Sequence, residues 1–435
     1  MVRRTEEITV ALDSLGCKLN QAEIDLLAGQ VAEAGYRLVS SADKADIYIL
    51  NTCTVTHIAD RKSRHWLRQA HRQNPDARVV AIGCYAEWAP QELAQIDGVD
   101  VVLGNEQKPY LLQRLWESRC LSRPLSVHQG GASRYHNGYR TRAFIKVQDG
   151  CRDYCAYCIV PLVRGSEKSE PVDRVVAEVR QLVADGAKEV VLTGTKLGSY
   201  KYDGVNLEEL LKHILAETDV TRLRLSSLQP QEISSGVIGL WHNRRLCPHF
   251  HLSLQSGSDD VLDRMKRHYT TADYRQAISL LREVVPEAAI TTDVIVGFPG
   301  ETDLEFQESY DFCRKMEFAR IHVFSYSSRR GTAAAQMPNQ IKDGAKKKRN
   351  QKMLTLAKES AQNFSRRFLG RTVLVLWEKQ AGGIWSGLTD NYIKVYTDSN
   401  SDLTNQLLSV TLMNFFNRDG VWGRVVSCSP SPPDS

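Results

Sequence analysis

The sequence contains no run of about 18 or more apolar residues, so it offers no candidate for a membrane-spanning helix. Its first ten residues, MVRRTEEITV, lack the apolar core of a secretory signal peptide. We therefore expect a cytoplasmic protein without membrane contact, in a compartment where thiols stay reduced. The ten cysteines are then expected to be metal ligands or buried thiols rather than disulfides.

Charge is distributed unevenly over the 435 residues, which carry a net charge of +5. Residues 341–371, called the basic segment below, hold ten Lys or Arg against two acidic residues. A cluster of this size is typical of a nucleic-acid-binding surface. The alternative is an ordinary solvated helix face. The length allows two to four domains, and the 42% of hydrophobic residues suffices for a sizeable core.

Three cysteines near the middle of the chain follow a C-x3-C-x2-C pattern. They are Cys151, Cys155 and Cys158, called the barrel thiols below, and a short apolar strand at 143–147 precedes them. A 4Fe-4S cluster normally takes one thiolate per iron, so three thiolates leave one iron open. An open metal position is typical of a catalytic site. Zinc, a disulfide pair or a chance cluster are the alternatives, but zinc needs a fourth ligand.

Three further cysteines each follow the end of a predicted strand. They are Cys17, Cys53 and Cys84, called the N-terminal thiols below, in the strings SLGC, LNTC and AIGC. The strands alternate with helices, which predicts a small doubly wound α/β domain. Because the carboxyl ends of parallel strands meet at one edge of the sheet, the three thiols can converge. We expect a second three-thiolate cluster; the alternative is three buried small apolar side chains.

The following segment alternates strand and helix six times, which predicts an incomplete (β/α)6 barrel with its chemistry at the carboxyl ends of the strands. The predicted strands cover residues 143–147, 189–192, 222–225, 249–254, 290–296 and 321–325. The loops that follow them are rich in glycine and polar residues, although single glycines there could be plain turn residues.

The last segment, with four short strands separated by turns, predicts a small antiparallel β-barrel. Its aromatic residues could stack on bases or fill the barrel core. The expected division of the chain is an N-terminal α/β domain, a linker, the partial barrel, a basic helical connector, the small barrel and a disordered tail. Their bounds are 1–119, 120–138, 139–340, 341–370, 371–428 and 429–435.

This combination resembles the radical S-adenosylmethionine (SAM) methylthiotransferases, which carry a C-terminal TRAM barrel. The resemblance runs from about residue 8 to residue 426. The strings that carry it are GCKLNQAEID, NTC, GCRDYCAYCIVPLVRG, LQSGSDDVLDRMKR, TTDVIVGFPGET and HVFSYSSRRGT. The resemblance implies a radical SAM barrel with two 4Fe-4S clusters and two SAM molecules per reaction.

In such an enzyme, one SAM methylates sulfur at the cluster of the N-terminal thiols. A second is cleaved at the cluster of the barrel thiols, and the resulting radical leads to methylthio insertion at carbon 2 of adenine. The protein positions the reactants and excludes water. Candidate SAM-contacting residues are Tyr157, Gly194, Ser227, Gln255 and Gly297.

Within the family, TGTKLGSY and SYSSRRGTAA look most like the branch that acts on N6-threonylcarbamoyladenosine next to the tRNA anticodon, at position 37. The threonylcarbamoyl carboxylate would need a cationic partner. Lys196, Arg329 and Arg330 are the candidates, with rim cations that touch phosphate or solvent as the alternative. Lys196 and Gln229 depart from that branch, where His and Glu are common at these positions.

The resemblance also implies partners: the anticodon stem-loop of tRNA, an electron donor such as a flavodoxin or ferredoxin, and a sulfur source. Two other substrates stay open, isopentenyladenosine in tRNA and a ribosomal protein side chain. From a different class, the chain could be a non-catalytic iron–sulfur protein that binds RNA.

Overall fold

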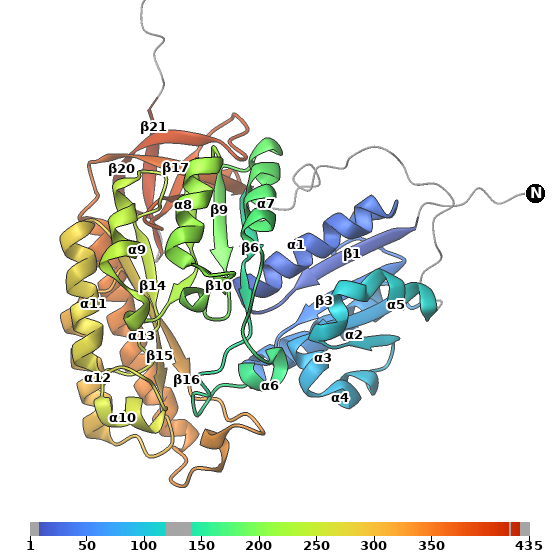
Figure 1. The fold of residues 1–435 in the computed structure, drawn as a ribbon, viewed down its shortest axis with the longest axis horizontal. Coiled ribbons are helices and arrows are strands. Elements are labelled where there is room, and N and C mark those ends of the chain that lie inside the picture. Colours follow the sequence, from blue (N-terminus) through green and yellow to red (C-terminus); the bar gives the residue numbers. More distant parts are fainter. Residues whose placement is uncertain (1–7, 119–140, 417–418, 427–435) are drawn as a thin grey trace, which may run out of the picture.

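The computed structural model describes residues 8–118, 141–416 and 419–426, so the predicted linker and tail lie outside the described residues. An N-terminal α/β domain lies beside a partial barrel, and a small closed barrel sits at one end of that partial barrel (Figure 1). This confirms the predicted fold class, whereas the exact domain bounds stay a prediction. Of the described helices, none combines the length and apolar character that a membrane crossing requires.

The N-terminal domain is a five-stranded parallel sheet with the order β2-β1-β3-β4-β5. Its strands are β1 (Thr9–Ser14), β2 (Arg37–Val39), β3 (Ile47–Thr52), β4 (Arg78–Gly83) and β5 (Val101–Leu103). Alternate residues of one strand enter different cores: Val10 and Leu12 pack with helix α1 (Lys18–Glu33), whereas Ala11 belongs to the core under helix α2 (His57–Gln73). Helices therefore cover both faces of the sheet, and its carboxyl edge stays free for the cysteine loops.

The partial barrel has six parallel strand positions. They are β6 (Arg142–Lys146), β9 (Glu189–Thr193), β12 (Arg222–Leu225) continued by β13 (Ser227–Leu228), β14 (His249–Leu252), β15 (Ala289–Val296) and β16 (Arg320–Ser325). The third position changes partners at Ser226: β12 pairs with β9, and β13 pairs with β14. In the described part of the chain β6 and β16 stay edge strands, so the barrel is open between them.

Helices cover the outside of the partial barrel. They are α7 (Val172–Ala184), α8 (Leu207–Glu217), α9 (Ser235–Gly239), α10 (Asp259–Arg264), α11 (Thr271–Val284), α12 (Asp303–Met316) and α13 (Asp343–Arg366). The last of these carries most of the basic segment. Met353, Leu356 and Ala357 of α13 belong to the barrel core, so its apolar face is committed to packing.

The C-terminal barrel is closed, with the order β17-β18-β19-β21-β20. Its strands are β17 (Thr372–Ala381), β18 (Ile384–Thr389), β19 (Lys394–Asp398), β20 (Leu407–Phe416) and β21 (Gly420–Val425). The pairs are antiparallel except β19 with β21, which is parallel. Trp377 and Trp385 lie in its core, so these two aromatic residues fill the barrel and do not form a base-stacking surface.

Two buried arginines and the half-buried Arg142 connect the C-terminal barrel to the amino ends of the strands of the partial barrel. Arg222 and Arg224 donate to the carbonyls of Leu374 and Asp390 at 2.7 Å each, and Arg142 donates to Glu378 and to the Tyr392 hydroxyl. The small barrel therefore covers the amino-terminal mouth. The opposite mouth, where the carboxyl ends of the strands lie, stays available for chemistry.

Candidate active site between the two cysteine loops

The barrel thiols lie on one loop between strand β7 (Gln148–Asp149) and helix α6 (Val160–Arg164). The structure brings the three sulfurs near enough to act on one another electrostatically. Two backbone hydrogen bonds of Ala156 connect the loop to its surroundings: its N–H donates to Met265, and its carbonyl accepts from Ala334. The loop shape is therefore set by neighbours from elsewhere in the barrel.

Burial controls the protonation of these thiols. It raises the pKa of Cys158 to about 12 and that of Cys151 to about 11. At neutral pH both are thiols, so a metal that binds them displaces protons. Close to them, Arg267 donates a hydrogen bond to the sulfur of Cys155 at 3.0 Å. Three soft sulfur donors beside a fixed cation suit an iron–sulfur cluster with one open iron.

Asp153, between the first two barrel thiols, connects the loop to two strand ends. Its carboxylate accepts hydrogen bonds from Lys196 at 2.5 Å and from Gln229 at 2.7 Å. Burial would raise the pKa of Asp153, but these two hydrogen bonds outweigh it and hold the pKa below its usual value. Lys196 is thus paired with a carboxylate of the protein, and its role toward substrate stays a prediction.

The N-terminal thiols come together at the carboxyl edge of the sheet. Cys17 precedes α1, Cys53 follows β3, and Cys84 begins the short helix α3 (Cys84–Trp88). All three act electrostatically on one another, and burial raises the pKa of Cys53 to about 12. Gly16 has a φ of +100°, and a Cβ there would lie 2.6 Å from the Cys53 sulfur, so only glycine fits. This donor set also suits a three-thiolate cluster.

Arg164, at the end of α6, connects the two cysteine loops. Its buried guanidinium donates to Asp149 at 2.9 Å in its own domain, and to Glu23 at 3.0 Å and Asn20 at 2.7 Å in α1. It also acts electrostatically on Cys17 and Cys84. One side chain of the barrel thiol loop is therefore part of the surroundings of the N-terminal thiols.

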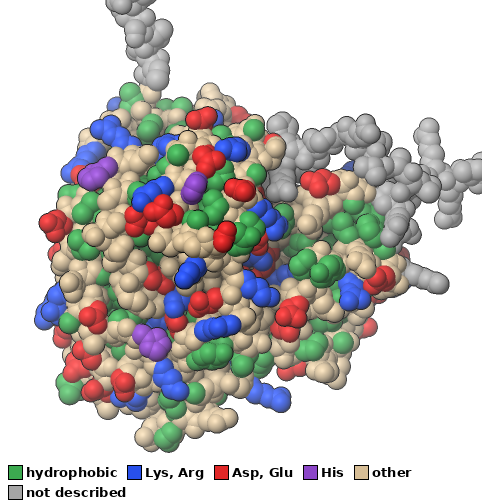
Figure 2. Space-filling view, in the orientation of Figure 1, with side chains coloured by type: hydrophobic (Ala, Val, Ile, Leu, Met, Phe, Trp, Pro, Cys, Tyr) green, Lys and Arg blue, Asp and Glu red, His purple; other side chains and the backbone are tan. Residues whose placement is uncertain are grey.

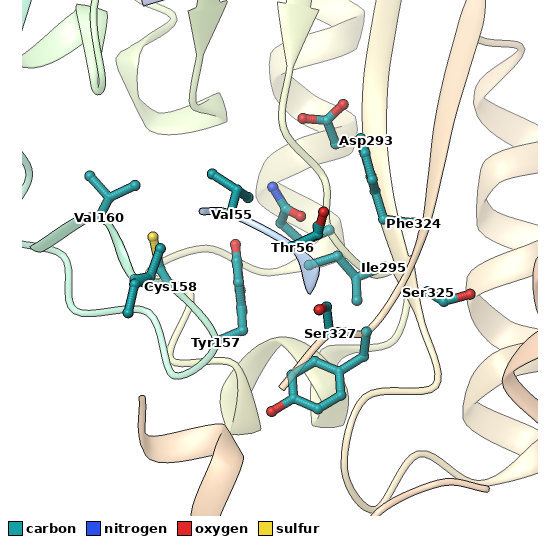
Figure 3. A pocket seen from close by; sticks show the side chains of 13 residues that line it. Val55, Thr56, Tyr157, Cys158, Val160, Asp293, Ile295, Phe324, Ser325 and Ser327 are labelled. Atoms are coloured by element: carbon teal, nitrogen blue, oxygen red, sulfur yellow. The ribbon is translucent and has the colours of Figure 1, made fainter. Parts of the chain in front are cut away.

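A cavity of about 190 Å³ lies between the two loops. Figure 3 shows Tyr157 and Cys158 on one side, and Asp293, Ile295 and Phe324 on the other. The N-terminal domain contributes Val55 and Thr56, from the loop that begins with Cys53. The remaining lining residues are Ile159, Val160, Gln255, Ser325, Tyr326 and Ser327. A ligand in this cavity would touch both domains.

Of the predicted SAM-contacting residues, the structure places Tyr157 and Gln255 in the cavity wall. Gly194, Ser227 and Gly297 lie at the carboxyl ends of β9, β12 and β15 but do not line it. Gly297 has a φ of +73°, and its N–H donates to Glu301 at 2.9 Å. All five roles stay predictions.

Arg329 is a buried contact between the domains. Its guanidinium donates to Asp60 at 2.7 Å and to Thr54, and it lies over the ring of Trp88. Arg330, the next residue, is exposed. The roles predicted for these two arginines in substrate binding are not tested by these contacts.

Sequence reasoning overlooked several cavity residues. Val55 and Thr56 follow Cys53, so the strand-end argument that found the cysteine could also have found them. Asp293, Phe324 and Ser325 lie within two of the strings that carry the family resemblance. Only their side-chain direction within β15 and β16 was missing from the sequence.

Comparison with known proteins adds two family models and many relatives. Residues 9–104 match the model described as uncharacterized protein family UPF0004, and residues 145–313 match the radical SAM superfamily. The threonylcarbamoyladenosine tRNA methylthiotransferase MtaB of Aquifex aeolicus is 39% identical over 401 residues, which cover 89% of this chain and 96% of that protein. The tRNA-2-methylthio-N(6)-dimethylallyladenosine synthase of Caldicellulosiruptor saccharolyticus is 34% identical, covering 85% of this chain and 82% of that protein.

This chain belongs to the radical SAM methylthiotransferase family. It is therefore a radical SAM enzyme, and the family uses SAM and 4Fe-4S clusters. Among solved structures, the radical SAM methyltransferase TsrM of Kitasatospora setae, with cobalamin and a 4Fe-4S cluster bound, matches with a TM-score of 0.54 and 16% identity. That match covers 76% of this chain and 77% of TsrM, and it shows a shared fold.

Replacing Arg164 by Met should weaken this methylthiotransferase at the junction of the two loops. The variant loses the charge-assisted hydrogen bonds to Glu23 and Asp149, at a cost of about 1.5–3 kcal/mol, while Lys108 and Lys146 continue to pair these carboxylates. We expect a lower Tm and faster limited proteolysis between the domains. Arg174→Met is the matched control, because it removes only a surface pair with Glu170. Equal Tm values for the two variants would contradict the importance of the Arg164 junction.

Proposed function

We propose that the chain is a tRNA methylthiotransferase that acts at carbon 2 of N6-threonylcarbamoyladenosine at position 37, next to the anticodon. The observation that carries the proposal is a cavity that lies between two separate three-thiol loops and is lined by residues of both domains. A reaction that needs a sulfur carrier and a radical source at one substrate requires this arrangement. The name of the Aquifex relative supports the choice of nucleoside.

In this proposal, the N-terminal thiols hold one 4Fe-4S cluster and the barrel thiols hold the other. When bound, the clusters and SAM supply the sulfur, the methyl group and the radical. The chain positions them: Tyr157 and Gln255 would contact SAM from the cavity wall. Gly194, Ser227 and Gly297, at strand ends outside that wall, would contact the rest of the cofactor. Val55, Thr56 and Phe324 line the cavity where the two domains meet.

The basic segment is the proposed tRNA-binding surface. Lys347, Lys348 and Lys358 on α13 are exposed, whereas Lys346 lies beside Gly297 and the ring of Tyr326 at the carboxyl mouth. The helix thus runs from that mouth to the C-terminal barrel. On the face shown in Figure 2, basic and acidic side chains are interspersed, so that face does not show a basic cluster comparable to the basic segment.

The finer partner assignments are also proposals. We place the reaction in the cytoplasm, where an electron donor such as a flavodoxin or ferredoxin would reduce the barrel cluster. A separate sulfur source would restore the N-terminal cluster after each turnover. The alternative function is methylthiolation of isopentenyladenosine, which is supported by the 34% identity to the dimethylallyladenosine enzyme.

Alanine replacements test the ligand assignment. Replacing all three barrel thiols should remove about half of the iron and abolish SAM cleavage, because each cluster holds the same number of irons. Replacing all three N-terminal thiols should remove the other half and leave cleavage measurable. Iron content and 5′-deoxyadenosine are the measurements. Cys247→Ala and Cys313→Ala, at buried cysteines outside both loops, should keep all iron. Full iron without the N-terminal thiols would refute the second cluster.

The salt dependence of tRNA affinity tests the basic segment. A Lys347→Ser, Lys348→Ser double variant should bind tRNA more weakly. Its slope of log affinity against log salt should be shallower by about one to two. The reason is that binding with fewer phosphate contacts releases fewer counterions from the RNA. Lys201→Ser with Lys212→Ser, two exposed lysines outside this segment, is the control. An unchanged slope would move the RNA surface elsewhere, for example to the exposed cations of α2.

Turnover on three anticodon stem-loops tests the substrate. They carry adenosine, N6-threonylcarbamoyladenosine or isopentenyladenosine and are otherwise identical. We expect the 2-methylthio product, detected by nucleoside mass spectrometry, from the threonylcarbamoyl stem-loop, because a site built for polar groups rejects analogues that lack them. Preference for the isopentenyl stem-loop would assign the chain to the sister branch. Absence of 5′-deoxyadenosine with every RNA would favour a non-catalytic RNA-binding protein.

A further inference from the structure

A polar group lies inside the barrel, next to the cavity, and none of the assignments above uses it. His251 on β14, Asp293 on β15 and His322 on β16 offer ligand atoms that all lie within 4.8 Å of one another. Asp293 and His322 are direct cross-strand neighbours. Asp293 also lines the cavity, so the group is reached from the place where the substrate base would sit.

The hydrogen bonds of the group leave part of it open to a ligand. His251 Nε2 lies 3.3 Å from one Asp293 oxygen, and His251 Nδ1 is hydrogen-bonded to Thr291 Oγ1 at 2.9 Å. Within the described residues, no hydrogen bond to the His322 ring is present. His322 therefore offers both ring nitrogens to whatever enters the barrel.

Lys18 brings a cation to the same place from the other domain. It follows Cys17 at the start of α1, and its ammonium lies 5.6 Å from the centroid of the Tyr392 ring, which in turn lies 4.4 Å from the ring of His249. His249 and His251 both contact the Thr291 hydroxyl, so Lys18 lies beside the polar group. In the part of the chain that the structure describes, Lys18 has no ion pair with a carboxylate, unlike Lys196 and Arg329.

The nature of a matching ligand follows from these charges. A metal ion at the three side chains would face the Lys18 ammonium, which repels it. An isopentenyl group has no polar atoms, so it would cover the Lys18 ammonium and the His322 ring without giving either a hydrogen-bond partner, which is costly. A group that combines a carboxylate with N–H and O–H donors would satisfy them. The N6 substituent of the proposed substrate has this composition.

We propose that Lys18, His322 and Asp293 form the subsite that holds the threonylcarbamoyl group, with Lys18 and His322 on its carboxylate and Asp293 on a urea N–H. This inference rests on the proposed function and adds a specificity site to it. Because Lys18 directly follows Cys17, the start of α1 would hold both a cluster ligand and the substrate carboxylate. The position of the substrate and the position of the sulfur are then fixed together.

Two matched stem-loops test the subsite on the reconstituted full-length protein. One carries N6-threonylcarbamoyladenosine, and the other carries its threonine carboxamide, which has the same shape without the charge. The wild-type protein should prefer the acid by about 10- to 100-fold in affinity and in methylthiolation rate, the range of one charge-assisted contact. Lys18→Met should reduce binding of the acid to the level of the amide and leave binding of the amide nearly unchanged. Lys18→Arg should keep part of the preference.

Controls separate this test from loss of the neighbouring cluster. Iron content and 5′-deoxyadenosine formation are measured for each variant. His322→Phe, on a strand distant in sequence from all six cysteines of the two thiol groups, should also lower the acid-to-amide ratio. Lys212→Met, at an exposed lysine on α8, should keep it. His322→Phe therefore keeps the proposal testable even where Lys18→Met loses iron.

Three outcomes would overturn the subsite. The first is an unchanged acid-to-amide ratio in iron-loaded Lys18→Met and in His322→Phe. The second is one divalent metal ion per chain besides iron, lost in His322→Phe, because it would occupy these donors. The third is a wild-type ratio of one with good turnover of both stem-loops. If the wild-type protein methylthiolates neither stem-loop, the proposed function itself fails, which is a distinguishable result.

Discussion

The buried guanidinium of Arg164 is the interaction on which the geometry of the site depends. It shares hydrogen bonds with Glu23 and Asn20 of one domain and with Asp149 of the other. A buried charge is tolerated only when its partners are in place, so the two domains cannot slide past one another without a large cost. Because Arg164 ends helix α6, which directly follows the loop of the barrel thiols, and Asn20 follows Cys17 closely, this constraint fixes one set of thiols relative to the other.

The open side of the barrel explains why a second contact is needed. The strands β6 and β16 leave a gap in the wall, and the N-terminal domain fills it, with Ala22 of α1 packed against Phe144 of β6. On the far side of the gap, Arg329 joins Asp60. The cavity is therefore lined mainly by the partial barrel, and the N-terminal domain adds Val55 and Thr56 to its wall. The C-terminal barrel covers the amino-terminal mouth, so a substrate base has one direction of entry.

The features that could be predicted from the sequence are those that depend on local sequence patterns. Cysteine spacing and strand ends identified both thiol groups, and strand–helix alternation identified the partial barrel. The sequence could not show that Arg164 meets Glu23, 141 residues away, or that Arg329 meets Asp60, 269 residues away. Such contacts depend on how domains dock. Lys18 was overlooked for the same reason. From the sequence alone, a lysine at the start of a helix is predicted to be exposed to solvent, and only the docking of another domain changes that prediction.

The two thiol groups differ in how their nearby cations are held, and this difference matches their proposed tasks. Arg267 donates directly to the sulfur of Cys155 at 3.0 Å and rests on the ring of Tyr269. A hydrogen bond to a ligand sulfur is one of the factors that set the reduction potential of an iron–sulfur cluster. Arg164 instead donates its hydrogen bonds to Glu23, Asp149 and Asn20. It therefore acts on Cys17 and Cys84 only electrostatically, without a direct hydrogen bond. A cluster that must deliver an electron benefits from direct tuning of its sulfur ligands. A cluster that must hold and release sulfur next to a substrate depends more on a fixed position, which the paired Arg164 provides.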